Sequence, residues 1–561
     1  MQRSRSELNS TWTWTAALAA LYALVAIGGV LILSPRVPYA DAWRFYPRLL
    51  STPWPLNVLI VDNGHVEVLP NLLRWIELRG FGGGQALQIA VGLALLVLCV
   101  WLWIDTIRPT RTDAAALAPI ARAAWLLTGV IGLTWFGSGR TMAHANESVH
   151  AYLVIACLFA ALRLASVPGP RRLAMALALG LLATLSFGTG VSVFAAVLAL
   201  LVLRRAGLRA YLGCVAAAAA SVCVYFLLPR AGAPAQVLDV HPWLQAQDAL
   251  RWLAAPYLYA GGPFVDARLL ERLPAIVCFI ATPTAMLSTR AFGDARAAVW
   301  PELALGLAGL VMLATLTWRA WCRPLAAATP VRIALATAWF AVACAGLVVL
   351  ARVDYFQSHP QQIYSNRYLV WSSLFWSGLL AATVLRMHAA GRLRLARGLP
   401  LMVAVLLLPS TFGMLWPARH MQRVAERDAV GVAVGALAPE DDHGENVVAE
   451  MVRARPVLAA AHTTVFAWPE SRLLGRPAPT ATPVEGIGHV RVTAIDNAFG
   501  SSAVRVSFTL PSVPATNRLL LLGHDGRVAG MAIPADTPGS WLGVAVGTPA
   551  SLAPIHAAGL R

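Results

Sequence analysis

The sequence contains no lysine and few acidic residues. All 44 of its strongly basic residues are arginine, against 27 Asp and Glu, which gives a formal net charge of +17. We interpret the absence of lysine as a genomic bias rather than a functional signal. Only 13% of residues are charged and 58% are hydrophobic. This composition excludes an ordinary soluble domain and predicts a polytopic membrane protein.

Cysteine is also scarce and carries no motif. None of the seven cysteines has CxxC spacing, and none occurs after residue 344. They lie in or beside apolar segments, which argues for a packing role and against a disulfide framework or a zinc site. The positive charge comes largely from arginines beside apolar runs, so a nucleic-acid partner is not expected. The cysteines are Cys99, Cys157, Cys214, Cys223, Cys278, Cys322 and Cys344.

Long hydrophobic runs are abundant. The first, at about 13–33, can cross a bilayer core of roughly 30 Å, and Arg3 and Arg5 before it indicate an uncleaved signal-anchor. With ten further runs, the sequence predicts about eleven membrane-spanning helices. The further runs lie near 85–104, 120–137, 149–165, 173–187, 190–203, 210–228, 300–318, 331–351, 368–386 and 398–415.

Arginines at the ends of these runs predict an orientation. They fall in alternate loops, so the positive-inside rule predicts a cytoplasmic N-terminus and a C-terminus outside the cytoplasm, which for a bacterial inner membrane is the periplasm. The loops 35–84 and 229–299 then lie outside. Residues 274–287 are apolar but few and include Pro283, and counting them as a span would reverse every later loop. We therefore interpret them as a re-entrant or interfacial helix.

Two short runs, 173–187 and 190–203, are separated only by Gly188 and Thr189. Arginines flank the two ends that lie away from this break, so both ends belong on the same side of the membrane. This predicts a hairpin with the tip Ser186 to Gly190. Irregular backbone is tolerated at membrane depth only where it lines protein or a cavity. We expect this tip to border an outward-facing cavity.

The pattern changes after the last run. The sequence predicts a transmembrane domain at 1–415, an extracytoplasmic helical connector at 416–476 and a small β-sandwich-like domain at 484–561. The connector has helical stretches at 419–437 and 445–461, the second interrupted by Pro456. Alternating apolar residues and a turn at Asp525-Gly526 indicate antiparallel strands. A packing or lid role is favoured over carbohydrate contact, because only Trp541 offers an aromatic platform.

The loop 35–84 carries the first candidate catalytic group. Asp41 follows the first span, and Trp43 and Arg44 beside it are candidates for substrate binding. A carboxylate next to a hydrophobic slab can act as a general base or can hold a divalent metal such as Mg²⁺ or Mn²⁺. A solvated helix cap is the alternative role for Asp41.

A second polar group in this loop contains Asp62, His65 and Glu67. His65 and Glu67 would share a face in an extended segment, whereas Asp62 and His65 would share one in a helical turn. Both conformations remain open. We predict Asp62, His65 and Glu67 as catalytic or orienting residues.

Two later outer loops are also rich in polar and aromatic residues. They suit substrate binding, since arginine captures phosphate with two hydrogen bonds and tyrosines can line a lipid groove. The alternative for the first loop is an ordinary solvated connection. The alternative for the second is that its arginines extend to the membrane–water interface and its tyrosines form part of an interfacial aromatic belt. The candidates are Arg140, His144 and Glu147 in one loop, which also contains His150, and Arg352, Tyr364, Arg367 and Tyr368 in the other, with Arg367 the first choice for phosphate.

The residues 10–420 resemble the GT-C superfamily of integral membrane glycosyltransferases, and more closely a group of bacterial multi-span proteins. The resemblance rests on DAW at 41–43, DNGHVEVLP at 62–70, SFGTG at 186–190 and SNRYLVWSSLFW at 365–376. Ala42 replaces a second acid that the group often has, and Gly64 replaces an acid in the second motif. The resemblance implies sugar transfer outside the cytoplasm from a polyprenyl-phosphate donor, with inversion and with Asp41 as the catalytic acid residue.

The expected fold is therefore mainly α, a polytopic GT-C-like helix bundle with a small extracytoplasmic β-domain. The expected activity is a membrane glycosyltransferase with a lipid-linked sugar donor and a glycan or lipid acceptor. A lipid or polysaccharide transporter or flippase is the alternative from another class, although the chain shows no internal repeat. An O-antigen polymerase or ligase would share the topology and the donor.

Overall fold

The structure is a computed structural model. It describes residues 2–61, 64–108, 117–229, 240–260, 299–322, 328–439, 445–477, 482–511, 516–535, 537–552 and 556–559. The predicted re-entrant helix at 274–287 and the candidate Asp62 lie outside the described residues.

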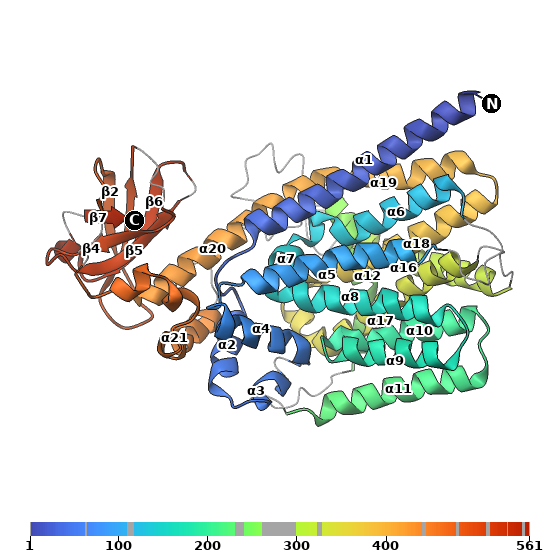
Figure 1. The fold of residues 1–561 in the computed structure, drawn as a ribbon, viewed down its shortest axis with the longest axis horizontal. Helices are drawn as coiled ribbons and strands as arrows, with labels where there is room; N and C mark the ends of the chain where they lie inside the picture. The colour runs from blue at the N-terminus through green and yellow to red at the C-terminus, as the bar shows by residue number, and fades with distance from the viewer. Residues whose placement is uncertain are drawn as a thin grey trace. The chain divides into compact units, whose positions relative to one another are not determined.

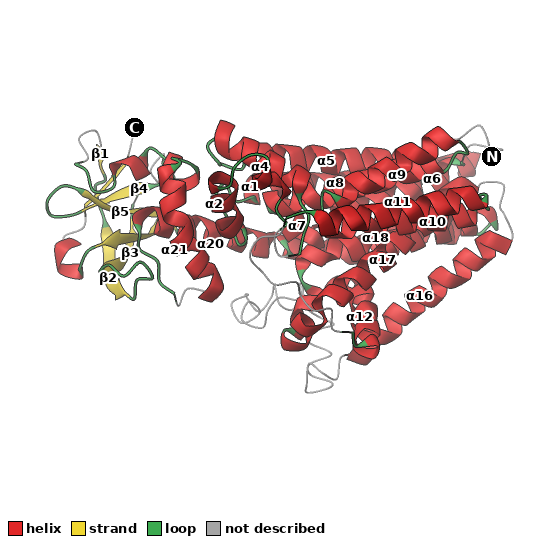
Figure 2. Ribbon diagram, turned by 90° about the horizontal axis from the view of Figure 1, so that it is seen from below, coloured by secondary structure: helices red, strands yellow, loops and turns green. Residues whose placement is uncertain are grey.

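The chain is mainly helical and ends in an antiparallel sheet (Figure 2). Within the described residues, nine helical segments are long and apolar enough to span a membrane. They are built from α1 (Gln2–Leu33), α5 (Ala86–Asp105), α6 (Pro119–Thr134) with α7 (Gly139–Ala143), α8 (Ala145–Ala165), α11 (Leu208–Leu227), α16 (Val299–Cys322), α17 (Ala328–Ser358), α18 (Asn366–Ala389) and α19 (Leu393–Gly413) with α20 (Leu415–Val434).

The two remaining predicted spans are helices too short to be counted. They are α9 (Pro170–Thr184) and α10 (Ser192–Leu203), joined through a short 3₁₀ helix at Gly188–Val191. The predicted hairpin is present, because α9 and α10 pack against each other (Figure 1). Gly190 makes the turn possible, since a Cβ there would overlap the carbonyl of Ala183.

The chain folds as two compact units. The first unit is Met1–Ser34, Leu59–Pro70 and Ile89–Ala418; the second unit is Pro35–Val58, Asn71–Gln88 and Arg419–Arg561. In the first unit α17 and α18 pack along each other, and α6 packs against α1 and α18 (Figure 1). The loop 35–84 is shared between the units.

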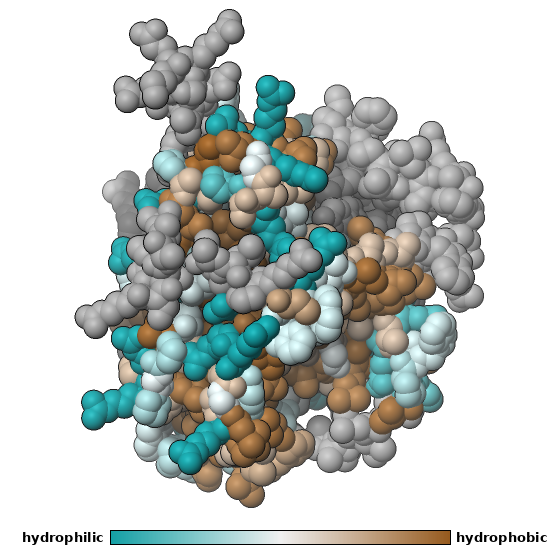
Figure 3. All heavy atoms as spheres, turned by 90° about the vertical axis from the view of Figure 1, so that its right-hand side faces the viewer, coloured by the Kyte–Doolittle hydropathy of each residue, from teal (hydrophilic) through white to brown (hydrophobic). Residues whose placement is uncertain are grey.

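Exposed arginines lie at one end of the first unit. Figure 3 looks onto this end, where hydrophilic residues are scattered among hydrophobic ones. The helix ends here include the start of α9 and the turn between α18 and α19, where Arg171 and Arg392 are exposed. The Arg205 side chain donates to the Trp321 carbonyl at 2.7 Å. Clustering of this kind is what the positive-inside rule expects of inner loops.

The second unit contains the sheet, two long helices and parts of the first loop. The described strands are hydrogen-bonded into one sheet in the order β1-β7-β4-β5-β6-β3-β2, with antiparallel pairing throughout. They are β1 (Thr482–Pro483), β2 (Gly488–Ile495), β3 (Ala503–Thr509), β4 (Leu519–Leu522), β5 (Val528–Pro534), β6 (Ser540–Val546) and β7 (His556–Gly559).

The sheet of the described strands has a buried core on each of its faces. Val506, Phe508 and Trp541 belong to a core that the strands form with one another. Leu520 and Met531 point into a different core, which contains residues of α20 and of α21 (Glu445–Ala460). Because helices cover the second face, a second sheet is not needed to bury it.

Two helices differ from the sequence expectation. α21 continues through Pro456, where an interruption was expected. The expected loop 229–299 contains α12 (Pro242–Ala260), which the sequence analysis did not identify. α12 packs against α16 and α17 in the first unit.

Candidate functional site

The segment Leu59–Pro70 belongs to the first unit and carries His65 and Glu67. Its backbone is fixed at two points. The Val61 amide donates to the Pro229 carbonyl at 2.8 Å, just after α11, and the Val68 amide donates to the Leu185 carbonyl at 2.8 Å, in the α9–α10 hairpin. These bonds hold both side chains beside the hairpin tip.

Four aromatic rings stack at this tip. The Phe187 ring lies between the imidazoles of His65 and His150, with centroid separations of 4.5 Å and 4.1 Å. Trp371 of α18 stacks on Phe187 at 6.2 Å. The sequence analysis noted His150 without selecting it and did not consider Phe187 at all. The available signal was the place of Phe187 in the SFGTG motif, directly before Gly188.

Charged groups surround the stack. Glu67 Oε1 lies 3.5 Å from His150 Nδ1, and Arg352 Nη2 lies 3.4 Å from His65 Nε2. Arg352 interrupts the helical backbone of α17, with φ −133° and ψ 15°. A guanidinium can only donate, so the contact requires His65 Nε2 to be the acceptor of a neutral imidazole.

The electrostatics keep His65 neutral. Burial lowers the pKa of His65 from 6.5 to about 4, and the positive charges of Arg352 and Arg367 act in the same direction, whereas Glu67 opposes them. The candidates Arg352 and Arg367 therefore both act on the same imidazole.

Arg367 lies in the first turn of α18, with its guanidinium 5.0 Å from the ring centroid of Tyr368. Its Nε is buried without a hydrogen-bond partner in the described part of the chain. Neither Arg367 nor Arg352 forms an ion pair with a described carboxylate. Within the described residues, Arg352 and Arg367 have no carboxylate partner, and with the neutral imidazole they form a positively charged locus.

The candidates Arg140, His144 and Glu147 form a separate cluster of ion-pair contacts at the α7–α8 junction. Glu147 Oε1 lies 2.8 Å from Arg140 Nη2 and 3.2 Å from His144 Nδ1. The carboxylate thus balances the charge of Arg140 within the protein. Glu147 and His150 are three residues apart on α8, so this cluster lies next to the aromatic stack.

Tyr364 is buried. Its hydroxyl contacts Glu302 of α16, and Arg251 Nε lies 3.0 Å from that hydroxyl and 3.2 Å from Glu302 Oε2. Arg251 also reaches Asp248 Oδ1 at 3.5 Å. The sequence analysis missed Arg251, Asp248 and Glu302, because nothing local marks residues of α12 and α16 as neighbours of Tyr364.

Asp41 belongs to the second unit, immediately before α2 (Ala42–Ser51). It stands at the N-cap position, but its side chain makes no capping hydrogen bond. Instead Asp41 Oδ1 lies 3.1 Å from Arg44 Nη1, and the same nitrogen lies 3.2 Å from Glu450 Oε1 on α21. Burial raises the pKa of Glu450, which Arg44 opposes. Trp43 is buried in the core of this unit.

No group of three or more His, Cys, Asp or Glu suited to a metal occurs among the described residues. The predicted metal at Asp41 stays a prediction, with one carboxylate and an arginine partner at that position. Comparisons with protein-family models and with curated proteins return no match for this chain. The functional argument therefore rests on the residues themselves.

Proposed function

We propose that the protein is a membrane glycosyltransferase that takes a sugar from a polyprenyl-phosphate donor and transfers it to a cell-envelope acceptor on the periplasmic face. The observation that carries the proposal is the positively charged locus of Arg352 and Arg367 in a unit made of apolar helices. Guanidinium groups without a carboxylate partner suit a phosphate, which accepts paired hydrogen bonds. The apolar helices suit a polyprenyl tail.

The neighbouring groups suit sugar transfer. Phe187 and its stacked histidines offer ring faces beside the arginines, and Glu67, whose Oε1 lies 3.5 Å from His150 Nδ1, offers a carboxylate. In the proposed reaction a carboxylate takes the proton of the acceptor hydroxyl. The hydroxyl oxygen of the acceptor then attacks the anomeric carbon of the donor sugar, and the lipid phosphate leaves with the electrons of the broken bond. Direct attack of this kind inverts the anomeric centre.

Asp41 and Glu67 are the two candidates for the base. Asp41 is half-exposed and paired with Arg44, whereas Glu67 is partly buried and lies near His150. In our proposal Asp41 acts as the base or holds a divalent metal, and Glu67 orients the acceptor. Separate substitutions of the two carboxylates distinguish these roles.

A transporter or flippase is the second candidate function. The buried network of Asp248, Arg251 and Glu302 favours it, because ionisable residues inside a membrane bundle mark transport pathways in many proteins. A polymerase or ligase of lipid-linked polysaccharide would instead use the same arginines, and only the product would separate it from the first proposal.

The test compares cells that carry Arg367→Gln, Arg352→Gln or the control Arg171→Gln, an exposed arginine at the start of α9. Membrane expression is matched, and envelope glycolipids and polysaccharides are measured by mass spectrometry. Loss of a charge-assisted hydrogen bond costs about 1.5–3 kcal/mol, so we expect at least about tenfold slower transfer in the first two and wild-type products in the control.

Asp41→Asn and Glu67→Gln complete the series. If Asp41 is the base, Asp41→Asn abolishes one glycan decoration and its lipid-linked precursor accumulates. An unchanged glycan profile in both arginine variants would contradict the proposal. If deleting the whole gene also changed no glycan, the transporter would become the better candidate.

A further inference from the structure

The last turn of α16 lies among arginines from other elements, at the arginine-rich end of the first unit (Figure 2). Arg319 in this turn is close enough to act electrostatically on Arg386, in the last turn of α18. Arg205 follows α10, and its guanidinium lies 5.6 Å from the ring centroid of Trp321, whose carbonyl it also contacts. Three segments that are far apart in the sequence thus place arginines around the end of one helix.

Described carboxylates do not balance the charges of Arg319 and Arg386. Neither residue forms an ion pair with a described carboxylate. Asp105, at the same end, already lies 3.2 Å from Arg163 and 3.0 Å from Arg108. The neighbouring segments contain arginine but neither aspartate nor glutamate; they are 166–172, 204–209, 319–332 and 386–397.

Arg386 also has a buried donor to spare. Its Nη1 atom is buried and has no hydrogen-bond partner in the described part of the chain. Buried donors are normally satisfied, so this one indicates an acceptor that comes from outside the chain. Arg319 and Arg386 repel each other, and an anion that contacts both guanidinium groups offsets that repulsion.

The exposed face of α16 is apolar up to this turn. Leu307, Val311 and Trp318 are exposed, and their spacing of four and seven residues places them on one side of the helix. The ring of Trp318 lies 5.4 Å from that of Trp321, which is also exposed. Tryptophan is enriched where the hydrocarbon core of a membrane meets water. An acyl chain therefore suits this face, and a headgroup suits the turn where it ends.

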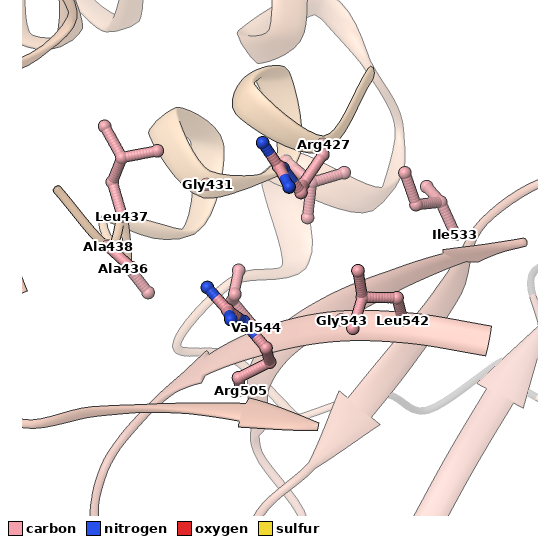
Figure 4. Close-up of a pocket in the computed structure, with 11 residues that line it drawn as sticks. Arg427, Gly431, Ala436, Leu437, Ala438, Arg505, Ile533, Leu542, Gly543 and Val544 are labelled. Carbon is pink, nitrogen blue, oxygen red and sulfur yellow. The ribbon is translucent and has the colours of Figure 1, made fainter. Parts of the chain in front are cut away.

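An arginine of the second unit shows the contrast. Arg427 borders a small cavity between α20 and the sheet (Figure 4). The volume of this cavity is about 20 Å³, which holds one water and no headgroup. Arg427 Nε also lies 3.8 Å from Asp428 Oδ1, so a carboxylate of the chain balances its charge.

We propose that the end of α16 binds the headgroup of an anionic phospholipid such as phosphatidylglycerol. The lipid phosphate accepts from Arg386 Nη1 and from Arg319, and the acyl chains lie along the apolar face of α16. A lipid fits better than free phosphate, because the arginines and the apolar face meet at one place. Arg367 and Arg386 lie in the first and last turns of α18, so this site is at the other end of that helix from the locus of Arg352 and Arg367. It does not depend on the proposed function.

Native mass spectrometry of the full-length protein in detergent tests the site by counting the lipids that stay bound. The probes are dioleoyl phosphatidylglycerol, the zwitterionic phosphatidylcholine with the same chains, and glycerol 3-phosphate as a headgroup without chains. We expect saturable binding of phosphatidylglycerol that is at least about tenfold weaker in Arg386→Gln and in Arg319→Gln, because each variant removes a charge-assisted hydrogen bond. Arg171→Gln removes an exposed arginine at the same end and should keep wild-type binding.

A further variant separates binding from folding. Arg386→Lys keeps the charge but not the guanidinium, and we expect it to bind phosphatidylglycerol more tightly than Arg386→Gln and more weakly than wild type. All variants should unfold at the wild-type temperature in phosphatidylcholine, which shows that they are folded. Equal binding of phosphatidylcholine, an equal loss in Arg171→Gln, or displacement of the lipid by equimolar glycerol 3-phosphate would overturn the proposal.

Discussion

At the scale of single residues, His65 connects the charges to the aromatic rings of the first unit. Its ring stacks on Phe187 and its Nε2 faces Arg352. A protonated imidazole at this position would face two guanidinium groups, so the folded protein keeps it neutral. The locus can then present its positive charge through arginines alone, which do not titrate near neutral pH.

This arrangement makes stability depend on pH. Between pH 6.5 and about 4 the unfolded chain protonates this histidine and the folded chain does not. The contribution of His65 is therefore complete above pH 6.5 and is lost as the pH falls toward 4. We expect His65→Gln to lose less stability than wild type between pH 7.5 and pH 5, measured as the midpoint of thermal unfolding in detergent.

The control for this measurement is His524→Gln, which removes an exposed histidine. It should respond to pH as wild type does. If the two substitutions change the pH response equally, burial of His65 does not account for the effect.

At the scale of elements, the α9–α10 hairpin decides where Phe187 lies. The hairpin turns within a few residues because Gly190 approaches the backbone of α9 so closely that a methyl group would overlap the Ala183 carbonyl. The same turn carries Leu185, whose carbonyl accepts from Val68 and so fixes the segment of His65 and Glu67. One glycine thereby positions residues from two parts of the chain.

We expect Gly190→Ala to destabilise the first unit by about 1–3 kcal/mol, because overpacking against fixed backbone forces the hairpin apart. The proposed transfer activity should fall with it. The measurement is thermal unfolding together with the glycan assay. Gly213→Ala is the matched control, since that α11 glycine has open space around it and alanine favours helix by up to about 1 kcal/mol. Equal stability of the two variants would refute the role of Gly190.

At the scale of the whole molecule, parts of the first loop fold with the C-terminal residues. Trp43, Tyr46 and Leu49 of α2 share a core with residues of α20 and α21. The ion pairs of Arg44 join Asp41 to Glu450 within the same unit. The C-terminal residues therefore form part of the surroundings of Asp41, which is more than the packing or lid role that the sequence indicated.

A charge placed in this core should open it. Ala454 on α21 is fully buried, and we expect Ala454→Asp to loosen α2, because an unpaired buried charge is costly. Limited trypsin digestion of the full-length protein, read by mass spectrometry, should then show faster cleavage after Arg48. Ala460→Asp changes an exposed alanine at the end of the same helix and should leave the cleavage rate unchanged. Equal protection of Arg48 in both variants would contradict this account.

The sequence by itself determined the features that depend on neighbouring residues. The apolar runs predicted the helices within a few residues, the Gly188–Thr189 break predicted the hairpin, and alternation predicted the antiparallel strands, because hydrophobic length and period are local properties. The candidates His65, Glu67, Arg352 and Arg367 were also found in this way, from residue type and position beside the spans.

Only the tertiary structure decided which of these residues meet. It placed Phe187 between two histidines, connected Tyr364 with Arg251, and assigned Asp41 and His65 to different units although they share one loop. It also covered one face of the sheet with helices. These outcomes depend on packing between segments far apart in the chain, and local patterns carry no record of which distant faces bury each other.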